Sequence, residues 1–353
     1  MRRLLELIDA FPARRVAVIG DLIADEFIYG RVERLSREAP VLILQYDSTE
    51  VLPGGAGNAA NNVAALGARA RIIALAGRDE PGKRLQAGLR NVDTGGILRP
   101  SGYCTPVKTR ILAGGVHTAK QQIVRIDRVV STEYDAKTRA AFARAALKAA
   151  AECDAILMSD YGTGLVTPEL ARALIKKVAA RSRRRPVPIL IDSRYDLMTY
   201  RGLTACTPNE SEVEQSLGLK IGDNVKTLER VGRQLLKRTR MRSVLITRGS
   251  RGMALFEVGR PTIHVPIHGS DEVADVTGAG DTVIATMTLA IAAGGSFHEA
   301  ARLANYAGGI VVMKRGTATV SPDELRAAVR SDNPQSPEPK AQSPKSRAQS
   351  PRT

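Results

Sequence analysis

Short apolar segments of strand type alternate with helical segments through most of this sequence, and this alternation limits the folds that it can adopt. The strand-like segments are 16–20, 155–159, 188–192, 203–207 and 243–247, and the helical ones are 58–66, 81–89, 135–151, 168–180 and 226–237. The pattern predicts an α/β fold with a doubly wound, mostly parallel sheet that is covered by helices on both faces. Ligands of such sheets bind at the carboxyl ends of the strands.

Two stretches, 26–52 and 106–128, break this alternation. Within the second, residues 107–112 and 122–126 alternate polar and apolar side chains, which is typical of strands. Because no helix intervenes, we expect antiparallel strands that project from the main sheet as a small β-sheet lid over the ligand site. A polar lid would leave exposed strand edges, so pairing with a second lid in a homodimer is a reasonable hypothesis.

The body of the chain, residues 1–330, has the composition of one large globular domain, since 43% of the sequence is hydrophobic. Residues 331–353 repeat Gln-Ser-Pro and carry only Ala341 and Ala348 as apolar side chains, so we expect a disordered tail. The first residues lack the apolar core of a signal peptide, and no stretch has the length of a membrane span. We therefore expect a cytoplasmic protein without a membrane partner.

A formal charge of +16 raises nucleic acid as a partner, with anionic small substrates as the alternative. The basic run at 181–185 lies where a helix should end, and aromatic residues are only 4% of the sequence, so nucleic-acid binding is the weaker interpretation. Three scattered cysteines and four histidines without metal-binding spacing favour neither a disulfide framework nor a transition-metal site. A hard ion with oxygen ligands stays open.

The segment Thr-Gly-Ala-Gly-Asp at 277–281, followed by an apolar run at 282–293, has the form of a catalytic helix start. Small residues before a helix let backbone N–H groups point at a phosphate or oxyanion, and the helix N-terminus adds positive charge. Asp281 is then placed to accept a proton from a hydroxyl group. The alternative is an Asp that only caps the helix. Asp275 and the compact glycines favour the catalytic role.

With this segment and three others, the sequence resembles the ribokinase-like, or PfkB-type, carbohydrate kinases. The resemblance covers residues 275–281, 53–60, 77–82 and 209–212, in the order that these motifs have in the family. It implies a ribokinase-like fold and an ATP-dependent kinase in which Asp281 removes the proton of the acceptor hydroxyl. It also implies that Gly278, Ala279 and Gly280 form the anion hole, which agrees with the needs of phosphoryl transfer.

The sugar site is expected near the second motif. Consecutive glycines at 54 and 55 before a helix allow a sugar to approach the backbone closely, with a plain turn as the alternative. Asn58 and Asp21 supply polar side chains for sugar hydroxyls, and in the resembling family an Asp at the end of the first strand has this role. We therefore expect Asp21, Gly54, Gly55 and Asn58 to bind substrate.

The resemblance also implies sites for the nucleotide and for ions. Asn209 and Glu212 are expected to organise Mg²⁺, partly through water, although their spacing fits a capping box equally well. Asp275 is expected at a K⁺ site near Gly316. The residues expected to border ATP are Asn209, Thr247, Arg248, Gly249, Gly252, Asn305 and Gly308.

Narrower similarities indicate the sugar. Residues 29–41, 108–110, 121–127 and 314–322 resemble the kinase half of the bacterial bifunctional heptose-phosphate kinases and adenylyltransferases. The implied reaction transfers the γ-phosphate of ATP to the C1 hydroxyl of D-glycero-D-manno-heptose 7-phosphate. Arg34, Lys108 and Arg110 would then hold the existing phosphate, with a solvated strand face as the alternative.

The sequence departs from the bifunctional pattern, because no His-x-x-His nucleotidyl motif is present and nothing after Pro322 resembles a second catalytic domain. Adenylylation is therefore expected to belong to another protein. Two alternatives stay open: a kinase of the same type for fructose 6-phosphate or ribose, and a non-catalytic sugar-phosphate or nucleic-acid binding protein on a kinase scaffold.

Overall fold

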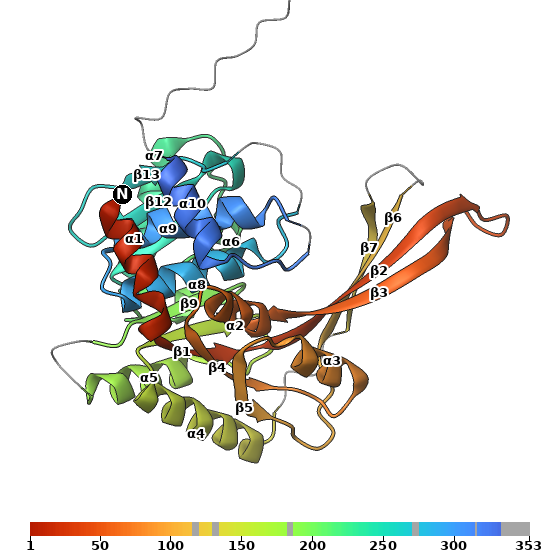
Figure 1. The fold of residues 1–353 in the computed structure, drawn as a ribbon, viewed down its shortest axis with the longest axis horizontal. Coiled ribbons are helices and arrows are strands. Elements are labelled where there is room, and N and C mark those ends of the chain that lie inside the picture. The colour runs from red at the N-terminus through yellow and green to blue at the C-terminus, as the bar shows by residue number, and fades with distance from the viewer. Residues whose placement is uncertain (115–119, 129–133, 182–185, 270–274, 315, 333–353) are drawn as a thin grey trace, which may run out of the picture.

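A nine-stranded sheet forms the centre of the molecule, and helices cover both of its faces (Figure 1). The computed structural model describes residues 1–114, 120–128, 134–181, 186–269, 275–314 and 316–332. The strand order is β13-β12-β11-β10-β9-β8-β1-β4-β5, parallel from β5 to β11 and antiparallel at β12 and β13. The expected α/β fold with a doubly wound, mostly parallel sheet is confirmed.

The strands of the central sheet are β1 (Arg15–Gly20), β4 (Arg69–Leu75), β5 (Val92–Leu98), β8 (Ala155–Asp160), β9 (Ile189–Ser193), β10 (Ala205–Cys206), β11 (Ser243–Thr247), β12 (Met253–Glu257) and β13 (Ile263–Val265). The helices are α1 (Arg2–Asp9), α2 (Ala56–Ala65), α3 (Glu80–Gly88), α4 (Ala136–Glu152), α5 (Pro168–Ala179), α6 (Glu210–Leu217), α7 (Val225–Thr239), α8 (Ala279–Ala292), α9 (Phe297–Val311) and α10 (Pro322–Ser331). Short 3₁₀ turns lie at Phe11–Ala13, Leu197–Thr199 and Gly249–Arg251.

The core consists of two hydrophobic clusters, one on each face of the sheet. Successive side chains of β1 alternate between them, because Val16 and Val18 belong to one cluster and Ala17 and Ile19 to the other. The first cluster contains buried side chains of α1, α2, α8, α9 and α10, and the second those of α4, α5 and α7. A central strand therefore has no polar face, which explains why the strands read as continuous apolar runs.

The lid is a separate four-stranded sheet that projects from the body as an arm (Figure 1). Its order is β3-β2-β6-β7, with bounds of Leu22–Leu35 for β2, Leu42–Gly55 for β3, Val107–Gly114 for β6 and Gln121–Arg128 for β7. The expectation of antiparallel strands is wrong for the middle pair, since β2 and β6 run parallel. The chain returns to the lid after passing through β4, α3 and β5, so β6 enters the lid from the same end as β2.

Three expectations concern the rest of the chain. The predicted tail begins at 331, whereas Ser331 is the last residue of α10, and residues 333–353 lie outside the described residues. Residues 182–185 of the basic run and 115–119 of the predicted lid also lie outside them. Within the described part of the chain, no helix combines the length and the apolar character that crossing a membrane requires.

Candidate active site

The carboxyl ends of the strands, the lid and the start of α8 enclose a cavity of about 200 Å³. Tyr161 follows β8, Arg194 follows β9, and Gly278 precedes α8, so the cavity lies at the edge where parallel α/β sheets bind ligands. Residues lining it are Ile23, Asp25, Gly55, Lys108, Arg110, Arg125, Tyr161, Arg194, Val276, Thr277, Gly278 and Asp281.

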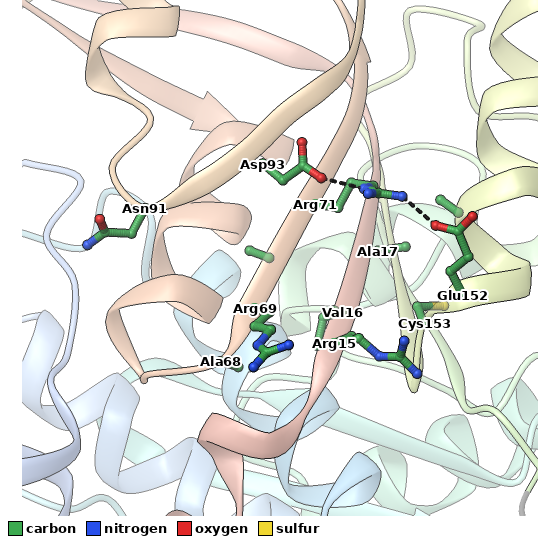
Figure 2. Close-up of a pocket in the computed structure, with 12 residues that line it drawn as sticks. Arg15, Val16, Ala17, Ala68, Arg69, Arg71, Asn91, Asp93, Glu152 and Cys153 are labelled. Atoms are coloured by element: carbon green, nitrogen blue, oxygen red, sulfur yellow. Dashed lines mark hydrogen bonds and ion pairs between the residues drawn. The ribbon is translucent and has the colours of Figure 1, made fainter.

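A different cavity, of about 440 Å³, lies at the amino ends of β1 and β4 (Figure 2). Its charged side chains are largely paired with one another. Arg71 donates hydrogen bonds to Asp93 and Glu152, at 2.6 and 2.7 Å, and Figure 2 shows both bonds. We therefore place the candidate active site at the carboxyl edge, around Asp281.

Asp281 lies in the first turn of α8 with only 4% of its surface exposed. Its Oδ2 accepts a hydrogen bond from Asn58 Nδ2 at 2.8 Å, and its Oδ1 accepts one from the hydroxyl of Tyr161 at 3.3 Å. Burial raises the pKa of Asp281 from 3.8 to about 7, and the Asn58 hydrogen bond acts in the opposite direction. A carboxylate with this pKa can take and hold a proton near neutral pH.

Asn58 is fixed behind Asp281 by a buried polar chain. Asn62 Nδ2 donates to Asn58 Oδ1 at 3.1 Å, and Thr282 Oγ1 donates to Asn62 Oδ1 at 2.9 Å. Asn58 Nδ2 also lies 3.3 Å from the carbonyl oxygen of Gly278. The amide of Asn58 therefore orients the Asp281 carboxylate. Its expected contact with a sugar hydroxyl stays a prediction.

Gly278 is the residue before α8 and has a φ of +78°, a conformation that L side chains rarely adopt. A Cβ atom at this position would lie 2.4 Å from Asn58 Nδ2. Glycine is therefore required both for the turn into the helix and for the contact that orients Asp281.

The predicted anion hole lies at this helix start. The N–H of Ala279 donates to the Val276 carbonyl at 3.2 Å, so it would have to share or leave that bond to bind an anion. Gly280 leaves room beside the half-buried Asp192, because a Cβ on Gly280 would still lie 3.9 Å from Asp192 Oδ2. The role of Gly278, Ala279 and Gly280 as an anion hole stays a prediction.

Asp25 is a site residue that the sequence analysis missed. It is 6% exposed, lines the cavity, and accepts a bond from Arg110 at 2.5 Å. Asp25 also explains the glycine at position 54, because a Cβ on Gly54 would lie 2.0 Å from Asp25 Oδ2. The signal was present in the sequence as two adjacent charged residues, Asp25 and Glu26, inside an otherwise apolar stretch at 22–28.

The structure places Asp21 behind the cavity rather than on its wall. Its Oδ1 accepts a bond from Thr163 Oγ1 at 2.5 Å, and its Oδ2 accepts one from the Tyr161 N–H at 2.7 Å. Burial raises the pKa of Asp21 to about 6. Asp21 thus holds the segment that carries Tyr161. The expected contact of its carboxylate with a sugar stays a prediction.

The lid contributes cations to the cavity, but not all of those expected. Lys108, Arg110 and Arg125 line it, whereas Arg34 lies exposed near the far end of β2 and does not. Arg110 is paired with Asp25, and Arg125 is paired with Asp127 at 2.5 Å. The sequence analysis also missed Arg194, which reaches the cavity from the main sheet.

A third cavity, of about 330 Å³, lies at the ends of β10 and β11. The predicted nucleotide residues Asn209, Thr247, Arg248 and Gly249 line it together. The Gly252 carbonyl accepts the Arg248 N–H at 2.9 Å and closes the turn behind it. These residues were predicted from separate motifs, and the structure brings four of them into one place.

Asn209 and Glu212 form a complete capping box at the start of α6. Burial raises the pKa of Glu212, and it raises that of Asp192 well above its usual value, with the nearby Glu212 and Asp281 adding to the effect on Asp192. Among the described residues, no group of three or more His, Cys, Asp or Glu side chains could hold a metal. Mg²⁺ usually keeps several waters and binds mainly to phosphates. Two oxygen donors such as those of Asn209 and Glu212 therefore suit it, and a closed cage of protein ligands is not needed.

The remaining predicted residues have structural contacts. Asn305 Nδ2 donates to the Pro266 carbonyl at 2.8 Å, and Gly308 on the same helix packs close to Val283. Asp275 accepts the N–H groups of Thr277 at 2.9 Å and Gly316 at 3.0 Å, which ties the loop before α8 to the segment after α9. Their roles toward adenine and K⁺ stay predictions.

Comparison with known proteins gives relatives in sequence and in structure. The chain is 40% identical over 311 residues to the "Bifunctional protein HldE" of Geobacter sulfurreducens, which covers 87% of this chain and 61% of the relative. It therefore spans less than two thirds of that protein's length. In fold it is similar to Arabidopsis thaliana ribokinase complexed with ribose and ATP, with a TM-score of 0.69, 18% identity and coverage of 90% and 99%.

Escherichia coli phosphofructokinase-2 in complex with fructose 6-phosphate is equally similar in fold, with a TM-score of 0.69, 17% identity and coverage of 90% and 99%. The sequence pattern of the family described as "pfkB family carbohydrate kinase" matches residues 13–324, which is most of the chain and includes Asp281. The chain therefore belongs to the pfkB family of carbohydrate kinases.

Proposed function

We propose that this protein transfers the γ-phosphate of ATP to the C1 hydroxyl of D-glycero-D-manno-heptose 7-phosphate and forms the 1,7-bisphosphate. The observation that carries the proposal is a buried carboxylate, Asp281, with a pKa of about 7 in a cavity lined by cations. The choice of heptose rests on the resemblance of the lid segments to heptose-phosphate kinases. A curated relative with the name "Bifunctional protein HldE" agrees with that choice.

In this mechanism Asp281 removes the proton of the acceptor hydroxyl as the phosphoryl group arrives. Asn58 and Tyr161 each donate a hydrogen bond to one carboxylate oxygen, so the direction of the carboxylate is set before substrate binds. The proton then stays on Asp281, since burial disfavours the charged form. The hydroxyl oxygen becomes a better nucleophile and forms the new bond to phosphorus.

ATP is proposed to lie between the cavity at the ends of β10 and β11 and the cavity around Asp281, with its terminal phosphate toward the start of α8. The backbone at 278–280 and the positive end of this 14-residue helix would stabilise the charge of the transferring group. Asn209 and Glu212 would hold Mg²⁺ through water, and the ion when bound would neutralise phosphate charge. Asp275 stays the candidate for holding K⁺ near Gly316.

We propose further that the enzyme is cytoplasmic and forms a homodimer through the lid. Apolar side chains on the lid strands support this, because Leu35 is 65% exposed, Tyr46 63% and Ile126 49%. A non-catalytic binding protein on the same scaffold would not need a carboxylate held in this manner.

The test is a screen of sugars with ATP and Mg²⁺, in which phosphorus NMR identifies the phosphorylated position. The heptose 7-phosphate should give the highest kcat/KM and a new signal from phosphate on the anomeric carbon. Higher kcat/KM with fructose 6-phosphate or ribose would reject the heptose and keep the kinase. Absence of turnover with every sugar, together with salt-sensitive RNA binding, would favour the non-catalytic protein.

A further inference from the structure

Two cations of the cavity, Lys108 and Arg194, approach the ring of Tyr161. The Lys108 ammonium lies 4.6 Å from the ring centroid, and the Arg194 guanidinium carbon lies 5.2 Å from it. Both distances are within the range of cation–π contact. One cation comes from the lid and the other from the end of β9, so the two meet only in the folded molecule.

These two cations differ from Arg110 and Arg125 because neither forms an ion pair with a carboxylate among the described residues. Glu212 and Asp192 still lie near enough to Arg194 for their charges to raise its pKa, against the effect of burial. Arg110 is neutralised by Asp25 and Arg125 by Asp127, whereas no ion pair joins Lys108 or Arg194 to a carboxylate in the described part of the chain. Burial lowers the pKa of Lys108, and the positive charge of Arg194 lowers it further. Two like charges beside one ring favour an anion that binds to both of them.

Tyr161 connects this pair to the reacting centre. Its hydroxyl donates to Asp281 Oδ1 at 3.3 Å, while its ring makes the cation–π contacts with Lys108 and Arg194. The N–H of the same residue is held by Asp21. A ligand that places a hydroxyl at Asp281 would therefore have its anionic group within reach of Lys108 and Arg194.

We infer that Lys108 and Arg194, seated on Tyr161, form the subsite for the phosphate that the sugar substrate already carries. The inference rests on the proposed function and makes these two residues determinants of specificity for phosphorylated over free sugars. Arg194 is exposed at the mouth of the cavity, so the phosphate can reach it from solvent. Lys108 belongs to the lid, so binding of the phosphate would draw the lid and the main sheet together.

The experiment measures equilibrium binding by calorimetry, without turnover. Inorganic phosphate and heptose 7-phosphate are titrated separately into protein that is saturated with a non-hydrolysable ATP analogue, so that the nucleotide's phosphate sites are filled. Lys108→Ala and Arg194→Ala should each weaken binding of both probes about 10- to 100-fold, the loss of one charge-assisted contact. The dissociation constant of the ATP analogue itself should change by no more than about twofold.

Two further variants separate this role from a structural one. Arg128→Ala removes an exposed cation of the same lid sheet that lies outside the cavity, and it should leave phosphate binding unchanged. Tyr161→Phe keeps the ring and should also keep phosphate binding. Arg194→Lys should recover part of the affinity that Arg194→Ala loses.

Unchanged phosphate affinity in both alanine variants, or a selective loss of affinity for the ATP analogue, would overturn the inference. Because inorganic phosphate is the first probe, the subsite is tested even if the heptose proves to be the wrong sugar. In that case the substrate screen would reject the heptose, while the alanine variants would still show weakened binding of inorganic phosphate.

Discussion

Asp281 combines burial with two hydrogen bonds, and these two features act on its pKa in opposite directions. Burial disfavours the charged carboxylate, while donors from Asn58 and Tyr161 favour it. The resulting value of about 7 suits a group that must accept a proton at neutral pH and is far from the ordinary value of 3.8. A residue that only capped the helix would have no use for this arrangement.

Replacement of this carboxylate should separate binding from chemistry. Asp281→Asn is expected to lower kcat by about 10³-fold, because the amide cannot accept the proton, and to leave ATP affinity within about twofold. Steady-state kinetics and nucleotide titration measure the two quantities. Urea unfolding at pH 8 is the control, and the variant should be at least as stable as the wild type, since the buried charge is removed. Wild-type kcat in a folded variant would contradict the mechanism.

The pH dependence of kcat follows from the same residue. Below about pH 7 Asp281 is protonated and cannot act as a base, so kcat should fall about tenfold per pH unit on the acidic side and reach a plateau above. Asn58→Ala removes a hydrogen bond that lowers this pKa, so its acidic limb should move to higher pH. A pH profile of kcat at saturating substrates measures both, and a limb that does not move would show that another group titrates.

The residues of the site were predictable to different degrees. Asp281 and Gly278 were predicted because their function depends on a local segment of a few residues. Asp25, Tyr161 and Arg194 were missed because each reaches the cavity from a different element, and no local pattern marks the meeting point. Asp21 was assigned to substrate from the family resemblance and its place at the end of the first strand, and this role stays a prediction. Its hydrogen bonds to Thr163 and Tyr161 could not be predicted, because both residues are distant in sequence.

At the scale of elements, the turn into α8 depends on one glycine. Gly278→Ala should cost about 3 kcal/mol of stability, because the positive φ disfavours a side chain and the Cβ would meet Asn58. Urea unfolding measures this cost, and kcat should fall as Asn58 is displaced from Asp281. Gly259→Ala is the matched control. It has a φ of +73° with nothing within 4 Å, so only about 1 kcal/mol is expected. Equal costs at both positions would contradict the proposed contact.

Most elements of the central sheet could be predicted, whereas the lid topology could not. Predicted strand 243–247 coincides with β11, and helix 168–180 ends one residue beyond α5. Strands β4, β5, β12 and β13 were not predicted. The parallel pairing of β2 with β6 was missed because period-two alternation describes the faces of a strand and carries no information on the direction of its neighbour.

At the scale of the whole molecule, the central sheet is covered on both faces while the lid is not. The lid strands carry apolar side chains that remain exposed in the single chain, among them Val32, Leu35, Leu42, Tyr46, Ile123, Val124 and Ile126. Large apolar side chains that stay exposed along one sheet favour an interaction surface on that sheet. Both β3 and β7 are also edge strands, which are open to pairing.

We therefore expect a homodimer whose interface is the lid, and charged substitutions on the lid should dissociate it. Leu35→Glu and Ile126→Glu each place a charge on an exposed apolar position of β2 or β7. Burying that charge in a dimer is costly, so sedimentation at micromolar concentration should show dimer for the wild type and monomer for the variants. Val258→Glu, at a position 68% exposed in the body of the molecule, is the control and should remain dimeric. The lid also supplies Lys108 and Arg110 to the cavity. The monomeric variants should therefore raise the KM for the sugar phosphate, relative to wild type, more than they raise the KM for ATP. Dimers that survive both lid substitutions, or a wild type that is monomeric, would show that the exposed lid surface has a different partner.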